Sequence, residues 1–583
     1  MKQQRLDATG DRDNLILGAG LAVVALAGVA GGWASLYVTA ALDDTPKPPL
    51  DPKQLIAALT SGQVQWTTTT SYVAAGLVVG LLLLVFLGIL LWPKGRGGKR
   101  MRSDRSARHM GRGRDVDHLT AAGSARIAKR LGAEGPGLPI GLSVAGRKML
   151  HTSWEDMAIL VAGPRTQKTT AYAIPALLAA PGAALATSNK PDLHAATRAL
   201  RAEKGRLWLF DPQQVVNGSE AAWYWDPLTY IAPRDEHGRI RRLSSGMVVA
   251  SETRAERLAA QLVTSARPAG AKVDAYFDTE AENLISLVLL AAACAGEPIT
   301  AVYSWLTEPK KCDAAAAVLH AETFVLQAEA LSALSGLPDK QRAGVFGTAR
   351  SLLTWLRNRD VVQWVTPNAD RAAFDPAAFA SSTDTLYPLS REGSGSVGPL
   401  VAALTMAVLD ALEERAAATP AGRLPVPFVG VLDEAANICR IRHLDAYYSH
   451  FGSRGIILLT VLQSWAQGAE AWGDKGMEKL WSSANARIYG GGVDDPAFLR
   501  RLSDLIGEVA QVQRSASTSK VGRTVTRSVQ RETILTPAEL RELPQGRAVV
   551  FASGTPAILT HPVPWWESLQ AASIHASLSE RAA

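Results

Sequence analysis

The chain has 583 residues, of which 47% are hydrophobic and 20% are charged. At roughly 150 residues per domain, this length predicts about three to four structural units. The composition excludes an intrinsically disordered protein and a small disulfide-stapled scaffold, and the mean hydropathy near zero is too low for a polytopic transporter. The three cysteines (Cys294, Cys312 and Cys439) have no close pairing, so they predict neither a disulfide framework nor a metal knuckle.

Two uncharged apolar stretches lie near the start of the chain, at residues 15–42 and 73–92. Each is long enough to cross a hydrocarbon core of about 30 Å, which takes about 20 helical residues. The second stretch has no polar face, and a basic segment follows it directly, as is typical of the cytoplasmic end of a membrane helix. Residues 1–93 therefore predict a two-helix transmembrane hairpin with both termini in the cytoplasm.

The net charge of +7 comes from the basic segment between Lys94 and Arg114, which has nine basic residues and one acid, Asp104. When these are removed from the 61 basic and 54 acidic residues of the chain, 52 and 53 remain. The net charge is therefore no reason to expect nucleic-acid binding over the whole surface. Two interpretations of the segment remain open: contact with anionic lipid, or contact with a nucleic-acid backbone.

Buried-strand candidates alternate with helical segments after this point. The strand candidates lie at residues 157–164, 182–189, 206–212, 384–389, 426–435, 455–464, 486–491, 547–553 and 556–563. Such alternation predicts a parallel sheet with crossover helices. Residues 515–531 are rich in Ser, Thr and basic residues, and they predict an exposed loop or hairpin.

The character of the chain changes between residues 251 and 365, where helical periods occur without convincing strands. We therefore predict an all-α domain at residues 251–365, inserted into an α/β domain formed by residues 151–250 and 366–565. Residues 94–150 are predicted to be a basic linker and the entry to the α/β domain, and residues 566–583 a C-terminal tail.

The segment LVAGPRTQKTT (residues 160–170) lies where a phosphate-binding P-loop is expected, between a strand and a helix. In a P-loop, backbone N–H groups cradle phosphates, a lysine reaches the terminal phosphates and a hydroxyl binds Mg²⁺. Lys168 and Thr169 fit the last two roles. Ala162 and Gln167 replace two glycines of the G-x-x-x-x-G-K-[ST] pattern, and a side chain at position 167 crowds the phosphates or strains the backbone. The predicted nucleotide-binding residues of this loop are Gly163, Pro164, Arg165, Thr166, Gln167, Lys168, Thr169 and Thr170.

Two acids, Asp433 and Glu434, end an otherwise uncharged apolar strand in VPFVGVLDEA (residues 426–435). In a P-loop ATPase the first acid supports Mg²⁺ and the second polarises the attacking water. We therefore expect Asp433 to bind nucleotide and metal together with Thr169, and Glu434 to be catalytic. The alternative is an ordinary helix N-terminus that carries acids.

A third segment, SRGIILLTVLQSWAQ (residues 453–467), supplies two further catalytic candidates. Gln463 ends a strand, where its amide can sense the γ-phosphate or orient water. Arg454 precedes the strand and is a candidate for charge stabilisation across a subunit boundary. The alternative is a surface arginine and a strand-end glutamine.

Taken in order, these segments resemble the TraG/TraD-type type IV coupling proteins, the ATPases of bacterial conjugation and type IV secretion. The matching segments, which span about residues 14–560, are the two apolar stretches, AGPRTQKTT, SNKPDLHAAT, LFDPQ, WDPLTYI, the helical insertion, TLYPL, FVGVLDEAANI, RGIILLTVLQSWAQ and LTPAELRELPQGRAVVF. The resemblance implies an α/β fold class: a RecA-like P-loop nucleotide-binding domain with an all-α insertion domain, preceded by a two-helix transmembrane hairpin. It also implies a two-pass protein of the bacterial inner membrane.

The function implied by the resemblance is that of an ATPase that binds ATP and Mg²⁺ between the subunits of a ring, generally a homo-hexamer. Such a motor receives a relaxase–single-stranded DNA complex and passes it to the channel proteins of a type IV secretion system. Matching positions assign Lys168 and Thr169 to the P-loop, Asp433 and Glu434 to the acid pair, Gln463 to the sensor and Arg454 to the trans-acting arginine. The departure is Gln167, where the family has glycine, and it bears on ATP affinity and turnover.

Three other functions stay open on the sequence alone. One is a membrane-anchored docking platform with weak or absent ATPase activity, which Gln167 favours and the retained Lys168, Thr169, Asp433 and Glu434 oppose. Another is an FtsK-like translocase of double-stranded DNA, although few residues follow Thr560 for a winged-helix tail. The third is secretion of protein cargo alone.

Overall fold

The computed structural model describes residues 31–91, 102–267, 271, 274–393, 395–519 and 522–579, with residues 81–91 and 512–527 described by their backbone. The chain divides into two compact units, Met1–Arg100 and Met101–Ala583.

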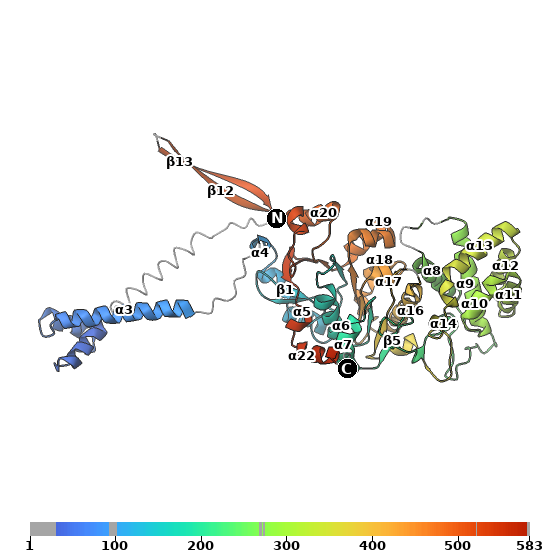
Figure 1. Ribbon diagram of the computed structural model, residues 1–583, viewed down its shortest axis with the longest axis horizontal. Coiled ribbons are helices and arrows are strands. Elements are labelled where there is room, and N and C mark those ends of the chain that lie inside the picture. The colour runs from blue at the N-terminus through green and yellow to red at the C-terminus, as the bar shows by residue number, and fades with distance from the viewer. Residues whose placement is uncertain are drawn as a thin grey trace. The chain divides into compact units, whose positions relative to one another are not determined.

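The first unit is helical (Figure 1, blue). It contains a helix at residues 31–42, followed by α2 (Pro52–Thr60) and α3 (Thr68–Leu91). Asp51 begins α2 because its side chain accepts a hydrogen bond from the Lys53 N–H, and Pro52 occupies the first helical turn.

No helix is both long and apolar enough to cross a membrane among the residues searched, which are those described above. This finding overturns the predicted two-helix transmembrane hairpin and the predicted two-pass inner-membrane location. A crossing takes about 20 apolar helical residues. The described helix of the first predicted span covers only residues 31–42, since residues 15–30 lie outside the described part, and α3 opens with the polar run Thr68–Ser71.

The basic segment is described from residue 102 onward, and residues 94–101 lie outside the described part. Its lone acid, Asp104, accepts hydrogen bonds from the Arg547 guanidinium at 2.7 and 2.9 Å. The elements of this region are α4 (Arg102–Ser106), η1 (Ala107–His109) and η2 (Gly113–Leu119).

An 11-stranded sheet organises the second unit, with the strand order β2-β1-β15-β14-β11-β3-β10-β9-β4-β8-β5. The run from β11 to β5 is parallel, and the other strands join antiparallel beside β11. The strands are β1 (Pro139–Ser143), β2 (Met149–His151), β3 (Ala158–Val161), β4 (Ala184–Thr187), β5 (Leu207–Phe210), β8 (Thr385–Pro388), β9 (Phe428–Leu432), β10 (Ile456–Leu462), β11 (Ala486–Tyr489), β14 (Ala548–Ala552) and β15 (Ile558–His561).

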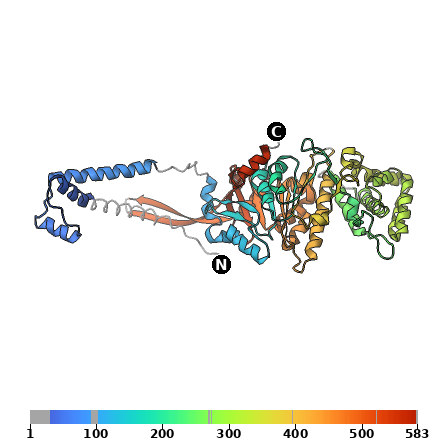
Figure 2. The ribbon, with the colours of Figure 1, turned by 90° about the horizontal axis from the view of Figure 1, so that it is seen from below.

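The parallel strands are buried on both faces, so their sequences are continuous apolar runs. Ile159 and Val161 of β3 enter the core on one face, and Ala158 and Leu160 enter the core on the other. Figure 2 shows helices on both sides of the sheet. One face is covered by α5 (Ala121–Arg130), α6 (Ile174–Ala179), α7 (Asp192–Ala202) and α22 (Ala571–Ser579), and the other by α16 (Gly398–Ala417), α17 (Ala435–Ile438), α18 (Leu444–His450), α19 (Trp465–Ser483) and α20 (Pro496–Ile506).

A helical domain lies between β6 (Trp223–Tyr224) and β7 (Ala372–Ala373), two short strands that pair in parallel. Its helices gather at one end of the second unit (Figures 1 and 2, green to yellow). Its elements are α8 (Glu252–Ala266), α9 (Phe277–Ala295), α10 (Thr300–Thr307), η5 (Pro309–Lys311), α11 (Cys312–Ala321), α12 (Val325–Ser335), α13 (Asp339–Leu352), η6 (Thr354–Arg357) and α14 (Arg359–Val362). The predicted domain boundaries stay predictions.

Helix α8 connects the helical domain to the sheet domain through polar side chains. Gln261 of α8 is 1% exposed; its amide donates to the Arg440 carbonyl at 2.8 Å and accepts from the Arg442 N–H at 3.0 Å. Arg257, also on α8, pairs with Asp410 of α16 at 2.7 Å. The bonds to Arg440 and Arg442 join the helical domain to the segment that follows α17.

Two segments can be set beside the sequence predictions. Residues 94–150, predicted to be a basic linker and the entry to the α/β domain, include β1 and the start of β2, which belong to the large sheet. Residues 515–531, predicted to be a loop or hairpin, belong to the hairpin of β12 (Glu508–Ser519) and β13 (Gly522–Thr533), a separate two-stranded sheet (Figure 1). The remaining elements are η3 (Thr169–Ala173), η4 (Pro227–Tyr230), α15 (Pro376–Phe379), η7 (Gly452–Arg454), α21 (Pro537–Arg541) and η8 (Trp565–Glu567).

Candidate nucleotide-binding site

The candidate site lies at the carboxyl edge of three adjacent parallel strands, β3, β10 and β9. The P-loop follows β3, the acid pair follows β9, and Gln463 follows β10, which lies between them. Because the carboxyl ends of parallel strands meet at one edge, residues distant in sequence converge there.

Lys168 and Thr169 end the P-loop and begin the helical segment η3–α6. The Lys168 ammonium donates to the carbonyls of Ala162 and Gly163, at 2.9 and 3.0 Å. The Thr169 hydroxyl donates to Asp433 Oδ2 at 3.2 Å. Burial lowers the pKa of Lys168, and the nearby Glu434 and Asp433 carboxylates oppose that shift. Of the predicted P-loop pair, Thr169 is therefore in contact with the predicted metal-binding acid, and the charge of Lys168 lies near that acid.

Position 163 requires a glycine because the P-loop closely approaches the loop after β11. A Cβ on this residue would lie 1.9 Å from the Gly492 carbonyl oxygen. The Gly163 N–H donates to the Gly491 carbonyl at 2.8 Å, and Gln545 donates to the Arg165 carbonyl at 2.9 Å. The P-loop is thus braced by the segment after β11 and by Gln545, which the sequence did not indicate as part of the site.

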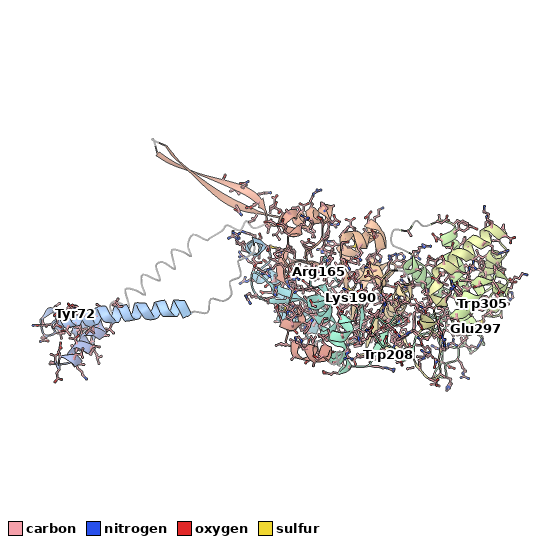
Figure 3. All side chains as sticks on the ribbon, in the orientation of Figure 1. Tyr72, Arg165, Lys190, Trp208, Glu297 and Trp305 are labelled. Carbon is pink, nitrogen blue, oxygen red and sulfur yellow. The ribbon has the colours of Figure 1, made fainter. Side chains whose placement is uncertain are left out.

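Arg165 and Gln167 both have left-handed backbones, with φ of 60° and 65°. Figure 3 labels Arg165, and also Lys190, which follows β4 at the same edge of the sheet. Left-handed conformations favour glycine because a Cβ clashes with the neighbouring backbone. Gln167 therefore adopts the conformation for which a glycine is expected. The other predicted loop residues support the turn: the Thr166 hydroxyl donates to the Gly163 carbonyl at 2.7 Å, the Thr170 hydroxyl donates to the Gln167 carbonyl at 3.4 Å, and Pro164 lies within the turn itself.

Asp433 is the most deeply buried of the predicted polar site residues, at 4% exposure. Burial, and then the adjacent Glu434 carboxylate, raise the pKa of Asp433 to about 6. Its Oδ1 is buried without a hydrogen-bond partner. A buried, unpartnered carboxylate oxygen beside the Thr169 hydroxyl fits the oxygen chemistry that Mg²⁺ prefers. Among the described residues no group of three or more His, Cys, Asp or Glu side chains could bind a metal, so Mg²⁺ here would depend on Asp433, Thr169 and phosphate oxygens.

Glu434 is 8% exposed and has a left-handed backbone, with φ of 54°. The Gln463 amide nitrogen donates to both Glu434 carboxylate oxygens at 2.8 Å. The predicted water-polarising acid, Glu434, and the predicted sensor, Gln463, are therefore joined by hydrogen bonds. The Gln463 amide fixes the direction in which the Glu434 carboxylate points.

Arg454 lies away from these residues within the chain. It precedes β10, whose seven residues span roughly 20 Å, whereas Gln463 follows the same strand. Its guanidinium pairs with Glu413 of α16 at 3.0 Å. The structure thus brings Lys168, Thr169, Asp433, Glu434 and Gln463 together and leaves Arg454 at the opposite edge of the sheet.

Four polar residues near Gln463 were not indicated by the sequence analysis: Asn189, Glu392, Asn437 and Gln467. Each follows a strand of the parallel sheet, and hydrogen bonds join them in a chain. The available signal was their common position a few residues after strands β4, β8, β9 and β10.

Sequence comparison identifies one matching family model, described as the TraM recognition site of TraD and TraG, over residues 427–545. The conjugal transfer protein TraG of Agrobacterium fabrum is 26% identical over 140 residues. That match covers 23% of this chain and 21% of the relative, so it spans about a fifth of the relative's length. The TraG protein of Rhizobium radiobacter matches with the same identity over 140 residues, which is 22% of its length.

Structural comparison finds the bacterial conjugative coupling protein TrwBdeltaN70 in its unbound monoclinic form. It has 18% sequence identity and a TM-score of 0.47, and the match covers 75% of this chain and 91% of that chain. The two sequence comparisons confirm the predicted resemblance: residues 427–545 match the family model of TraD and TraG, and 23% of this chain is similar to a TraG conjugal transfer protein.

Proposed function

We propose that this chain is an ATPase that couples nucleotide hydrolysis to the transfer of a nucleoprotein substrate into a type IV secretion or conjugation channel. The observation that supports this proposal is the convergence of Lys168, Thr169, Asp433, Glu434 and Gln463 at one edge of the sheet.

The P-loop residues bind the nucleotide in this proposal. Lys168 exchanges its bonds to the Ala162 and Gly163 carbonyls for the terminal phosphates. Thr169 and Asp433 would hold Mg²⁺, which would neutralise phosphate charge. The unpartnered Asp433 Oδ1 is the atom that supports this assignment.

Glu434 polarises the attacking water, and Gln463 orients the Glu434 carboxylate. Arg454 acts on nucleotide bound to a neighbouring subunit, because its place at the opposite edge keeps it from the site of its own chain. This assignment requires a ring, for which we propose a homo-hexamer.

The proposed substrate is a relaxase–single-stranded DNA complex, and the proposed partners are DNA and the channel proteins of the secretion system. The curated relatives that match this chain are named conjugal transfer proteins. This name supports a role in DNA transfer.

The second candidate function is a docking platform with weak or absent turnover. The left-handed backbone of Gln167 favours it, because a non-glycine residue there strains the P-loop. The intact contacts between Thr169 and Asp433 and between Gln463 and Glu434 favour the ATPase.

ATP binding and hydrolysis by the full-length chain, with and without single-stranded DNA, distinguish these functions. The Lys168→Ala protein should lose ATP binding and turnover. The Glu434→Gln protein should bind ATP but lose turnover by at least about 100-fold, the effect typical of a general base.

Lys129→Ala is the matched control, since Lys129 is an exposed lysine of α5. It should behave as the wild type. Turnover that survives both Lys168→Ala and Glu434→Gln would overturn the ATPase assignment, and ATP binding without turnover in the wild type would favour the docking platform.

A further inference from the structure

We propose that Glu392, Asn437 and Gln467 form a hydrogen-bond relay that positions Gln463 and, through it, Glu434. This inference rests on the proposed ATPase function. It assigns positioning roles in hydrolysis to three residues that lie outside the P-loop and the acid pair.

The relay is continuous from the loop after β8 to the site. Asn437 Nδ2 donates to Glu392 Oε1 at 2.8 Å, and Gln467 Nε2 donates to Asn437 Oδ1 at 2.6 Å. Gln467 Oε1 then accepts from the Gln463 backbone N–H at 3.0 Å. The Gln463 side chain completes the path with its two bonds to the Glu434 carboxylate.

Glu392 sets the direction of every bond in this relay. An ionised carboxylate can only accept hydrogen bonds, so Asn437 must present its NH₂ group to Glu392 and its oxygen to Gln467. Gln467 must then present its NH₂ group to Asn437, which leaves its oxygen for the Gln463 N–H. Asn189 also donates to Glu392 Oε1, at 2.6 Å, and fixes the carboxylate from the end of β4.

The relay joins four neighbouring strands of the sheet. Asn189 follows β4, Glu392 follows β8, Asn437 lies on α17 after β9, and Gln467 lies on α19 after β10. A movement of the loop after β8 therefore reaches the catalytic acid through groups that touch neither Lys168 nor Thr169. For this reason the relay should affect the chemical step and leave nucleotide binding unchanged.

The bonds between Glu392, Asn437 and Gln467 are solvent-exposed, so they contribute little to the folded core. Their loss should leave the protein folded. It should also have a moderate kinetic effect, since water competes for each exposed group.

The test uses the full chain with Gln467→Leu, which removes both side-chain hydrogen bonds of Gln467. We expect kcat to fall about 3- to 10-fold, with KM within about twofold of the wild type. Hydrogen exchange at the Gln463 amide should become faster, because Gln467 Oε1 is its acceptor. This exchange measurement needs no turnover.

Gln327→Leu is the matched control. Gln327 is a half-buried glutamine of α12 whose amide donates to Glu252 at 3.0 Å, away from the site. It should leave kcat, KM and the exchange of Gln463 unchanged.

A double-mutant cycle tests whether the relay acts through Gln463. In a Gln463→Ala background the bonds to Glu434 are already lost, so Gln467→Leu should lower kcat no further. Three outcomes would overturn the relay and leave the ATPase assignment intact. They are additive effects of the two substitutions on kcat, a wild-type kcat in Gln467→Leu, and a change in KM in place of a change in kcat. A wild-type protein without hydrolysis would overturn the proposed function and, with it, this catalytic role.

Discussion

Gln167 and Arg165 give the P-loop an unusual backbone, because two residues with side chains occupy left-handed conformations within three positions. A left-handed residue other than glycine costs about 1–2 kcal/mol. Such strain commonly occurs at functional sites, where the surrounding structure enforces it. In this chain the enforcement comes from the close approach of Gly163 to Gly492 and from the bond between Gln545 and Arg165.

We predict that Gln167→Gly leaves ATP turnover equal to the wild type or raises it by up to about tenfold, because glycine removes about 1–2 kcal/mol of backbone strain. The measurement is kcat and KM for ATP. A gain in turnover could come from relief of backbone strain or from removal of the crowding side chain. Gln167→Ala separates these two causes, since alanine removes the crowding side chain but keeps the strained Cβ. A large loss of activity in Gln167→Gly would show that the Gln167 side chain makes a productive contact with nucleotide.

At the scale of elements, the contact between α8 and α16 includes a buried acid. Asp410 of α16 is 5% exposed; it pairs with Arg257 at 2.7 Å and accepts from the Tyr230 hydroxyl at 2.5 Å. Burial raises the pKa of Asp410 to about 6, although Arg257 and Tyr230 act in the opposite direction. The effect of desolvation on the pKa of this carboxyl group is therefore larger than the opposite effect of Arg257 and Tyr230.

A raised carboxyl pKa means that the folded protein binds a proton more tightly than the unfolded chain. The contribution of Asp410 to stability is therefore greatest at low pH, and it is lost as the pH rises from about 4 to about 6. We predict that Asp410→Asn, which cannot ionise, gains stability relative to the wild type over that range, by at most about 3 kcal/mol.

Thermal unfolding at pH 4.5 and at pH 7 measures this difference. Asp370→Asn is the control, because Asp370 is an exposed acid after the helical domain. An equal effect of Asp410→Asn at both pH values would contradict the prediction.

The sequence predicted those elements whose apolar residues form a clear pattern. The buried parallel strands β3, β9 and β10 are uninterrupted apolar runs, so these strands and the segments after them were found. Strands β1 (PIGLS) and β2 (MLH) were missed because Pro, Gly, Ser and His leave no uninterrupted apolar run in them. The relay residues were missed because single Asn and Gln side chains carry no pattern, and only the strand order brings them together.

The transmembrane prediction failed for a different reason. It relied on the hydropathy of continuous stretches, whereas no helix among the described residues is both long and apolar enough to cross a membrane.

At the scale of the whole molecule, the β12–β13 hairpin forms its own sheet, separate from the large one. Its register pairs Gln511 with Gln530, so the chain can be rejoined there by a short turn. We predict that replacing residues 512–529 with Asn-Gly changes the unfolding free energy by less than about 1 kcal/mol, because no strand of the large sheet is altered.

The measurement is thermal unfolding of the shortened protein beside Ile488→Ala. Ile488 is a fully buried residue of β11, and its truncation should cost about 2–5 kcal/mol. A shortened protein as unstable as Ile488→Ala would show that the hairpin contributes to the folded core.

The paired strands β6 and β7 have a mechanical consequence. The chain enters and leaves the helical domain through these two strands, which lie side by side, so tension on that domain passes through both at once. They lead to β5 and β8, the last two strands in the strand order of the large sheet. Strands β4, β9 and β10 separate β8 from β3. A pull transmitted along the chain therefore loads the sheet at its margin, several strands away from the P-loop after β3, while the bonds of α8 to Asp410, Arg440 and Arg442 provide a second route into the sheet domain.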